Sequence, residues 1–422
     1  MENLAKYKLG DIACIIGGVA YNPADICDKG IRILRGGNIQ NKAIVTKSDD
    51  VFLPLEYSNC ENQIRIGDTI LVASTGSVEV LGKAATCFSD LPNTQIGAFM
   101  RIVRPKRPEY AMLISIALTS DYFARYIKAQ AKGTSINNIT IGYLKNFNIM
   151  CPHSFEPICS LYSKIEAKIA LNREINRNLE AMARQLYDYW FVQFDFPDEN
   201  GRPYKSSGGA MVWDQKLKRE IPQGWHCGTL LDIAEYTNGL ACQKFRPTSD
   251  SKLPVIKIKE MHVGLSDDTE WVKADIPDEV KVFDGDVLFS WSASLEVMLW
   301  AYGKGGLNQH IFKVTSKNGY PRSFYFYQCV SYICVFKQMA EARKTTMGHI
   351  TQDHLRQSTI ALPPNIEIVH KLEEKLCPIL DAIVKNSQEI MNLTKQRDEL
   401  LPLLMNGQVS VKPTSVNCDL SH

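Results

Sequence analysis

The sequence predicts an α/β (α+β) fold in which two related modules are separated by a long antiparallel two-helix coiled coil. Three features predict it: a repeated segment, a long heptad-patterned stretch after each copy, and an aromatic-rich connector between the copies. Residues 9–18 read LGDIACIIGG and residues 230–239 read LLDIAEYTNG, with Leu, Asp, Ile, Ala and the last Gly in matching places. Two such long repeats do not make a solenoid, so we expect two globular modules related by a pseudo-twofold axis.

The repeat continues along both copies and sets the expected boundaries. Gly67-Asp68 matches Gly285-Asp286, and the run Ile139-Thr140 matches Ile350-Thr351. We predict six segments, namely module 1 (1–152), a first long helix (153–193), a connector (194–224), module 2 (225–364), a second long helix (365–407) and a tail (408–422).

Each module reads as β-rich runs followed by a helix. In module 1 the runs are 31–34, 68–74 and 99–103, and helical spacing covers 110–130. In module 2 the corresponding runs are 255–258, 286–291 and 310–314, with a helical stretch at 323–343. The shared order supports one fold used twice.

The two long helices carry coiled-coil patterns. Apolar residues fill eight of ten seam positions in the first helix and nine of eleven in the second. The predicted seams are 158, 161, 165, 168, 172, 175, 179, 182, 186 and 189, and 369, 372, 376, 379, 383, 386, 390, 393, 397, 400 and 404. Asn172 and Asn386 either set the register of the seam or face solvent, and Pro378 is expected to kink or restart the second helix.

The connector and the bulk composition narrow the class of protein. Phe194, Phe196, Val212 and Trp213 favour a connector that is ordered by burial, unlike a free linker. The N-terminus lacks a basic segment followed by an apolar core, and the 12 cysteines without such a signal indicate reduced thiols. We therefore expect a cytoplasmic location. The formal net charge of +2 means that any grip on nucleic acid depends on local charge or on partner subunits.

Catalytic patterns are weak. The segment GSVEVLGKA (76–84) fails as a P-loop because five residues separate its glycines and Ala84 stands where Ser or Thr is required. Asp268, Glu279 and Lys281 loosely match a metal-dependent nuclease, which keeps a self-contained DNA nuclease as one alternative. A coiled-coil adaptor with no nucleic-acid role is the other. We expect no catalytic residues, no metal site and no cofactor site in this chain.

The connector and its flanks resemble the specificity subunits of Type I restriction–modification systems. The resemblance is carried by RQLYDYWFVQFDFP (184–197), GRPYKSSGG (201–209), MVW (211–213) and IPQGW (221–225), which are similar to the central conserved region of that family. The segment QRDELLPLLMNGQV (396–409) resembles the end of the second conserved helix of the family.

This resemblance implies a non-catalytic subunit with two target recognition domains. Each domain would read one half of a bipartite, asymmetric site in double-stranded DNA, and the helix pair would set the gap. The implied partners are two methyltransferase subunits and two restriction/translocase subunits. S-adenosylmethionine, ATP and Mg would be used by those partners and not by this chain.

Candidate DNA contacts come from polar, glycine-containing loops that occur at matching places in both modules. Base edges are read by Arg, Lys, Asn, Gln, Ser and Thr, and phosphates by Lys and Arg. In module 1 the candidates are Arg32, Arg35, Asn38, Ser74, Thr75, Lys132, Thr134, Ser135 and Asn137. In module 2 they are Lys257, Lys259, Ser292, Arg343, Lys344, Thr345 and Thr346.

Overall fold

A computed structural model describes residues 4–40, 42–47, 49–77, 80–130, 137–266, 268–292, 294–342, 350 and 352–411. The chain divides into two compact units, one made of Met1–Ala167 with Thr394–His422 and the other of Lys168–Leu393. Module 1 lies in the first unit and module 2 in the second. None of the described helices is long and apolar enough to cross a membrane.

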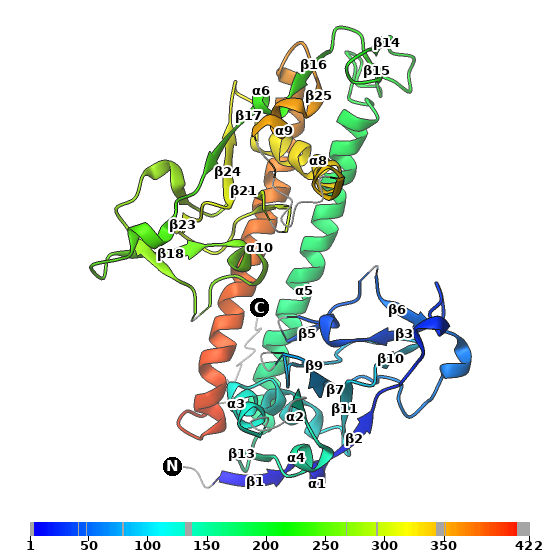
Figure 1. Ribbon diagram of the computed structural model, residues 1–422, viewed down its shortest axis with the longest axis vertical. Coiled ribbons are helices and arrows are strands. Elements are labelled where there is room, and N and C mark those ends of the chain that lie inside the picture. The colour runs from blue at the N-terminus through cyan, green and yellow to red at the C-terminus, as the bar shows by residue number, and fades with distance from the viewer. Residues whose placement is uncertain are drawn as a thin grey trace, which may run out of the picture. The chain divides into compact units, whose positions relative to one another are not determined.

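Module 1 is built on a four-stranded antiparallel sheet in the order β2-β11-β7-β9 (Figure 1). A second sheet, β10-β3-β6, contains the parallel pair β3–β10, and β1 pairs with β13. The strands are β1 (Leu4–Lys8), β2 (Ala13–Gly17), β3 (Ile31–Leu34), β4 (Ile39–Gln40), β5 (Ala43–Ile44), β6 (Val51–Leu53), β7 (Thr69–Val72), β8 (Ser74–Thr75), β9 (Ala84–Thr86), β10 (Thr94–Ile96), β11 (Met100–Pro105), β12 (Asn137–Asn138) and β13 (Asn148–Pro152). The helices are α1 (Leu9–Ile12), α2 (Tyr110–Leu118), α3 (Asp121–Gln130) and α4 (Ile141–Lys145), with short 3₁₀ turns η1 (Pro23–Asp25), η2 (Gly36–Asn38) and η3 (Leu55–Tyr57).

Module 2 repeats this arrangement. Its four-stranded antiparallel sheet has the order β17-β24-β21-β22, and the sheet β19-β18-β23-β20 contains the parallel pair β18–β23. The strands are β16 (His226–Thr229), β17 (Ala234–Asn238), β18 (Lys252–Ile256), β19 (Trp271–Lys273), β20 (Lys281–Val282), β21 (Val287–Ser290), β22 (Glu296–Leu299), β23 (Gly305–Leu307), β24 (Ile311–Ser316) and β25 (Thr359–Leu362). The helices are α6 (Leu230–Ile233), α7 (Ile258–Val263), α8 (Arg322–Ala342) and α9 (Gln352–Gln357), with η5 (Cys242–Phe245) and η6 (Asp278–Val280). The prediction of one fold used twice is confirmed.

A close backbone crossing explains why the repeated segment ends in glycine. A Cβ atom on Gly18 would lie 2.0 Å from the carbonyl oxygen of Gly97, and one on Gly239 would lie 2.3 Å from that of Asn308. Residues 19 and 97 form a parallel bridge, as do 240 and 308. No side chain fits at either crossing, so both modules require glycine at the same place.

The helices that follow the strands are partly as expected. The stretch 110–130 forms two helices, α2 and α3, because the Ser120 hydroxyl accepts the Phe123 N–H and starts a new helix. Leu113, Ile114 and Phe123 are fully buried in the core of module 1 with Leu71 and Val103. In module 2, α8 is continuous and buries Phe324 and Phe336 in the core that contains Phe289.

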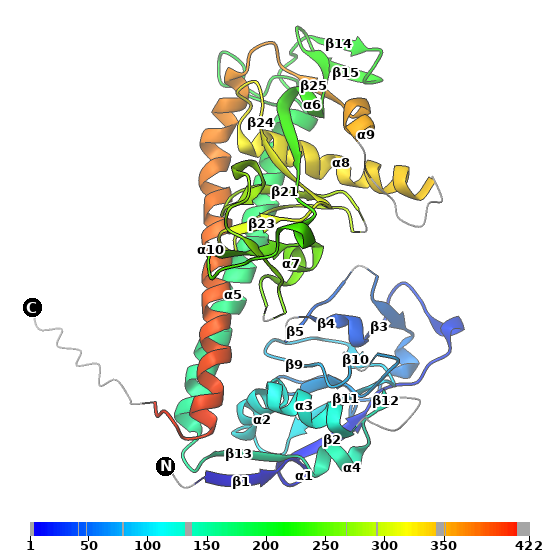
Figure 2. The same cartoon turned by 60° about the vertical axis from the view of Figure 1, so that its left-hand side comes forward.

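The long helices are α5 (Glu156–Tyr187), which ends in a π-helical turn at Asp188–Val192, and α10 (Glu367–Met405) (Figure 2). In the first unit Ile158 and Tyr162 are buried with Leu404, and Glu166 accepts from Arg397 at 2.7 Å. In the second unit Asn176 donates to the carbonyl of Ile383 at 3.2 Å, and Ala183 lies in one buried cluster with Leu376 and Leu372. Rising numbers on α5 meet falling numbers on α10 in each unit, so the pairing is antiparallel.

The predicted seam of α5 is wrong at positions 168, 175, 182 and 189, although Leu161 packs against the buried cluster of Ile158 and Tyr162. Ile175, Met182 and Tyr189 are 37%, 49% and 37% exposed, whereas the next residues, Asn176, Ala183 and Trp190, are buried. Seam positions can be placed at alternating spacings of three and four or of four and three residues, and both choices fit one helix. The choice by apolar character was wrong because two of the residues that are buried, Asn176 and Ala183, are polar or small. The seam of α10 is largely confirmed, with Val369, Leu372, Leu376, Ile383 and Leu404 buried.

Two further expectations concern the polar residues and the proline of the long helices. The register interpretation of the asparagines is supported, since buried Asn172 donates to Glu389 at 2.7 Å and Asn386 donates to Asn176 at 2.9 Å. Helix α10 does not restart at Pro378.

In the connector, strands β14 (Met211–Asp214) and β15 (Arg219–Pro222) form a hairpin. Phe194 and Phe196 are buried, but Val212 and Trp213 are 42% and 59% exposed, so their predicted burial is wrong.

Candidate nucleic-acid interface

Three segments of module 1 meet at one edge of its sheets. The N–H of Gly97 donates to the carbonyl of Leu34 at 2.9 Å, which sets the turn after β10 beside Arg35 at the end of β3. The carbonyl of Phe99, in that turn, accepts the N–H groups of Ala73 and Ser74 at 2.8 and 3.0 Å. We call this edge, made by Arg35, Ser74, Thr75 and Phe99, the first strand-end surface.

Module 2 builds the same edge with the equivalents of two of these backbone hydrogen bonds. Asn308 N–H donates to the carbonyl of Ile256 at 3.0 Å, and Trp291 N–H donates to the carbonyl of His310 at 3.3 Å. Lys257 follows β18 as Arg35 follows β3. The second strand-end surface is therefore made by Lys257, Trp291, Ser292 and His310.

One loop of each module rejoins its strand-end surface. Ile139 N–H donates to the carbonyl of Ala73 at 2.7 Å, and Asn137 pairs with Thr75 between β12 and β8. In module 2, Ile350 N–H donates to the carbonyl of Trp291 at 2.9 Å. The predicted contacts on the rest of these loops lie outside the described residues, namely Lys132, Thr134, Ser135, Arg343, Lys344, Thr345 and Thr346.

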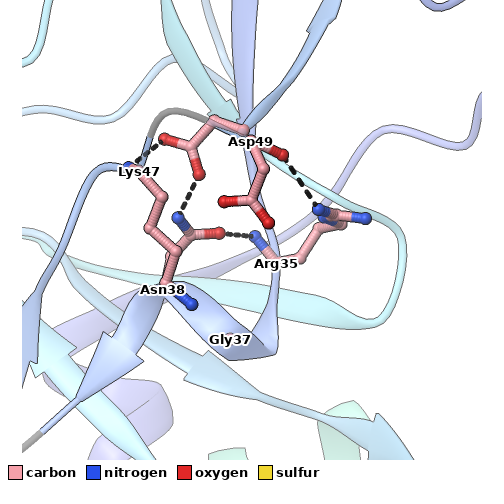
Figure 3. Close-up of a pocket in the computed structure, with 6 residues that line it drawn as sticks. Arg35, Gly37, Asn38, Lys47 and Asp49 are labelled. Carbon is pink, nitrogen blue, oxygen red and sulfur yellow. Dashed lines mark hydrogen bonds between the residues drawn. The ribbon is translucent and has the colours of Figure 1, made fainter. Parts of the chain in front are cut away.

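A polar pocket of about 240 Å³ opens beside Arg35 (Figure 3). It is lined by Arg35, Gly37, Asn38, Lys47, Asp49 and Asp50. Asn38 is buried, accepts the N–H of Arg35 at 2.8 Å and donates to Asp50 at 2.5 Å, so its amide is already engaged in holding the turn η2. Arg35 donates to the carbonyl of Asp49 at 3.5 Å, and neither Arg35 nor Lys47 forms an ion pair with a described carboxylate.

Arg32 pairs with a carboxylate that lines the pocket, unlike Arg35 and Lys47. Its guanidinium is 3.3 Å from Asp50 and sits over the ring of Phe52 at 5.3 Å from the centroid. Since Asp50 offsets the charge of Arg32, we expect Arg32 to grip a phosphate less strongly than Arg35 does.

The two predicted cations of module 2 that the structure describes, Lys257 and Lys259, are paired. Lys257 lies 2.5 Å from Glu270, and Lys259 contacts Asp268. Hydrogen bonds from Lys259 and then from Ser266 lower the pKa of Asp268 to about 2, and the hydrogen bond from Lys257 lowers the pKa of Glu270. Both carboxylates therefore stay ionised at neutral pH and offset the two lysines. Ser292 is buried, which leaves the lysines as the more accessible candidates.

Sequence reasoning missed Phe99, Trp291, His310 and Lys47. Phe99 and His310 occupy matching positions of the turns in TQIGAFMRIV and GLNQHIFKV, so aligning these turns would have found them. Lys47 follows no repeated pattern and reaches the site only through the fold.

The nuclease alternative gains no support from geometry. Asp268 is held by Lys259, and Lys281 lies 2.6 Å from Asp278. Among the residues that the structure describes, no group of three His, Cys, Asp or Glu side chains could hold a metal ion.

A second candidate interface is an exposed apolar stripe on α5 and its final turn. Leu171, Ile175, Met182 and Tyr189 repeat at helical spacing and are 37% to 50% exposed. Met182 and Tyr189 border an open groove of about 520 Å³ that also includes Gln185, Leu186, Asp188 and Gln193. A stripe of this kind, next to polar rim residues, is typical of a protein-binding surface.

Comparison with known proteins agrees with the two-module geometry. The family model described as the Type I restriction modification DNA specificity domain matches residues 1–181 and 222–399, one match on each half. The chain is 24% identical to the MjaIX specificity subunit of Methanocaldococcus jannaschii, covering 97% of this chain and 89% of that protein. It is also 24% identical to the EcoKI specificity subunit of Escherichia coli, covering 97% and 90% of the two chains.

A solved structure has the same fold. The S subunit of a Type I restriction–modification system from M. genitalium aligns with a TM-score of 0.56 and 13% identity, over 97% of both chains. Since the family model covers both halves, with the long helices between and after the modules, this chain belongs to the DNA specificity subunits of Type I restriction–modification systems, which carry no catalytic activity themselves.

Proposed function

We propose that each module reads one half of a bipartite, asymmetric site in double-stranded DNA through its strand-end surface. The observation that supports this most directly is the repeated edge. The same backbone hydrogen bonds present Arg35 with Phe99 in one module and Lys257 with His310 in the other. The two edges share a backbone arrangement but carry different side chains, which suits two half-sites of different sequence. A palindromic site would not require different side chains on the two edges.

The helix pair is the proposed spacer between the half-sites. A stretch of 35 residues of helix is about 50 Å long, comparable with one to one and a half turns of B-DNA at about 34 Å a turn. The register of the pair is held by buried Asn172 and Asn176 in the second unit and by buried Arg397 in the first. A spacer needs one register, and polar seam residues provide it.

The catalytic steps belong to partner subunits in this proposal. Two methyltransferase subunits would use S-adenosylmethionine to methylate adenine N6, and two restriction/translocase subunits would use ATP and Mg. The exposed stripe of Leu171, Ile175, Met182 and Tyr189 is the proposed contact for a methyltransferase subunit. An apolar stripe with a polar rim suits a stable subunit interface better than a DNA contact, which is positively charged.

The spacer is tested by deleting one heptad from α5 together with one from α10. Seven residues correspond to about 10 Å of helix, or about three base pairs. The assembled complex is incubated with duplex libraries in which the gap between half-sites varies, and the bound gaps are sequenced. We expect the preferred gap to shorten. An unchanged gap in a complex that still binds both half-sites would contradict the spacer.

The docking stripe is tested by Met182→Glu, which places a charge in the middle of the groove. We expect this variant to lose the methyltransferase subunit on size-exclusion chromatography. Val263→Glu is the matched control, because Val263 is 46% exposed on α7, outside the stripe. If both variants retain the partner equally, the contact lies elsewhere.

A further inference from the structure

One side chain in module 1 stands out on the first strand-end surface because it is apolar and exposed. Phe99 is 70% exposed in the turn between β10 and β11. A single exposed apolar side chain is ordinary on a protein surface, so Phe99 is distinguished by where its ring lies and by how its backbone is held. Its position, between Arg35 and Ser74, is the place where the proposed function puts DNA.

The backbone that carries Phe99 is held on three sides. Met100 N–H donates to the carbonyl of Gly97 at 2.9 Å and closes the turn. The carbonyl of Phe99 accepts two N–H groups, from Ala73 and Ser74. The guanidinium of Arg101 donates to the carbonyls of Ala98 and Met100 at 2.9 and 2.7 Å. A ring on so constrained a backbone loses little conformational entropy when it binds.

The equivalent position of module 2 has different chemistry. His310 is half-buried, and its ring centre lies 5.6 Å from that of Trp291, whose indole N–H donates to the side-chain oxygen of Asn238 at 2.9 Å. Gln309 Nε2 lies 3.4 Å from His310 Nε2. The two turns therefore match in backbone but differ in what they offer, an exposed apolar ring in one and a polar ring against Trp291 in the other.

We infer that Phe99 is a specificity-determining residue that packs against the C5-methyl group of a thymine in the half-site read by module 1. This inference rests on the proposed function and names one contact within it. Phe offers no hydrogen bond, and the thymine methyl is the apolar group that base pairs present in the major groove. Module 2 does not make this contact, because its matching residue is His310.

The test replaces each thymine of the bound site, one at a time, by deoxyuridine, which lacks only that methyl group. Binding of the complex of this chain with its methyltransferase subunits is measured by titration. Removing one buried methyl group is expected to weaken the wild-type complex about fourfold at one thymine of the first half-site. Phe99→Ala should bind the thymine and deoxyuridine duplexes equally. Ile66→Ala is the matched control, since Ile66 is 66% exposed and precedes β7 at the opposite end from Ser74.

The outcomes separate the inference from the proposed function. If the wild-type complex has no bipartite preference, the proposed function fails. If it binds a bipartite site but no thymine of the first half-site is sensitive to methyl removal, or Phe99→Ala keeps the sensitivity, only the thymine contact is overturned. A large loss of affinity in Phe99→Ala for both duplexes, with the thymine and deoxyuridine duplexes still unequal, would indicate a wedge between bases and would also overturn it.

Discussion

Modules 1 and 2 share a backbone frame and differ in how their strand-end surfaces are charged. In module 1, Arg35 and Lys47 line an open pocket without an ion pair to a described carboxylate. In module 2, Lys257 and Lys259 are paired with Glu270 and Asp268. Binding to DNA phosphates depends on cations that are free to replace the counterions of the DNA. Module 1 is therefore expected to bind DNA more through contacts to the phosphate backbone of the DNA than module 2 does. Module 2 is expected to depend more on base contacts.

A buried polar residue holds the backbone below each strand-end surface, and the two residues differ in their hydrogen-bonding roles. Asn38 accepts the N–H of Arg35 and donates to Asp50, whereas Glu260 accepts the N–H of Lys257 at 3.1 Å and the hydroxyl of Thr269 at 3.3 Å. In module 1 the buried residue, Asn38, is the donor to Asp50, and in module 2 the buried residue, Glu260, is the acceptor from Thr269. The donor and acceptor roles are therefore exchanged between the modules. The frame therefore tolerates new side chains when both members of a hydrogen-bonded pair change together.

The common frame is tested most severely at its glycines. Gly18→Ala and Gly239→Ala each place a Cβ within 2.0 to 2.3 Å of a backbone carbonyl oxygen. We expect each to destabilise its own module by about 3 kcal/mol, the upper range for overpacking, measured by chemical denaturation with hydrogen exchange to locate the loss. Gly17→Ala is the control because nothing lies within 4 Å of its Cβ. Loss at Gly18 but not at Gly239 would show that the crossings are not equivalent.

The exchanged pairs give a second comparison. Asn38→Asp would place a carboxylate where Asn38 now donates to the carboxylate of Asp50 at 2.5 Å, and we expect a loss of about 2 kcal/mol from the lost hydrogen bond and the buried repulsion. Glu260→Gln keeps an acceptor for the Lys257 N–H, so its expected loss is under about 1 kcal/mol. Thermal unfolding of both variants measures the difference. Equal losses would mean that charge does not distinguish the two pairs.

The difference in surface charge is tested by DNA binding. Arg35→Ala is expected to weaken binding to the first half-site by about 1 to 2 kcal/mol, and Lys257→Ala to weaken binding to the second half-site by less, because Glu270 already offsets that charge. Glu270→Gln should increase the affinity for the second half-site. Titrations at several salt concentrations check this, with a smaller salt slope expected for Arg35→Ala. An equal effect of Arg35→Ala and Lys257→Ala would remove the proposed asymmetry.

The repeated frame could be predicted from the sequence because backbone crossings restrict residue choice. Gly18 and Gly239 are required by sterics, so they survive in both copies and can be aligned. The sequence indicates that the segments 73–77 and 131–138 are both polar loops, but it does not predict the pairing of Asn137 with Thr75. These features depend on the backbone, which the two modules share.

The residues of the strand-end surfaces and of the helix seam depend on the direction in which each side chain points. That direction cannot be read directly from the sequence. Phe99 and His310 share a turn but no chemistry, so their residue types did not mark them as a pair, although an alignment of the two turns would have matched them. Asn176 and Ala183 are buried in the helix pair in place of Ile175 and Met182, because a polar contact to Ile383 and a small residue next to Leu376 suit the seam. Apolar character alone selected the residues that face outward.

The smallest expected effect concerns pH, and it tests whether the lysines of module 2 are paired under ordinary conditions. The pKa of Asp268 is depressed to about 2 in the folded chain, below its usual value of 3.8, by hydrogen bonds from Lys259 and Ser266. A depressed pKa means that the contribution of this pair is complete above pH 4 and is lost as the pH falls through about 2. The contribution of the Asp268–Lys259 pair to binding of the second half-site should therefore be constant between pH 5 and pH 8. Carbon-13 NMR titration of the Asp268 carboxyl measures its pKa directly, and a midpoint near 4 would show that Lys259 is free in solution, which would make the second surface as available to phosphates as the first.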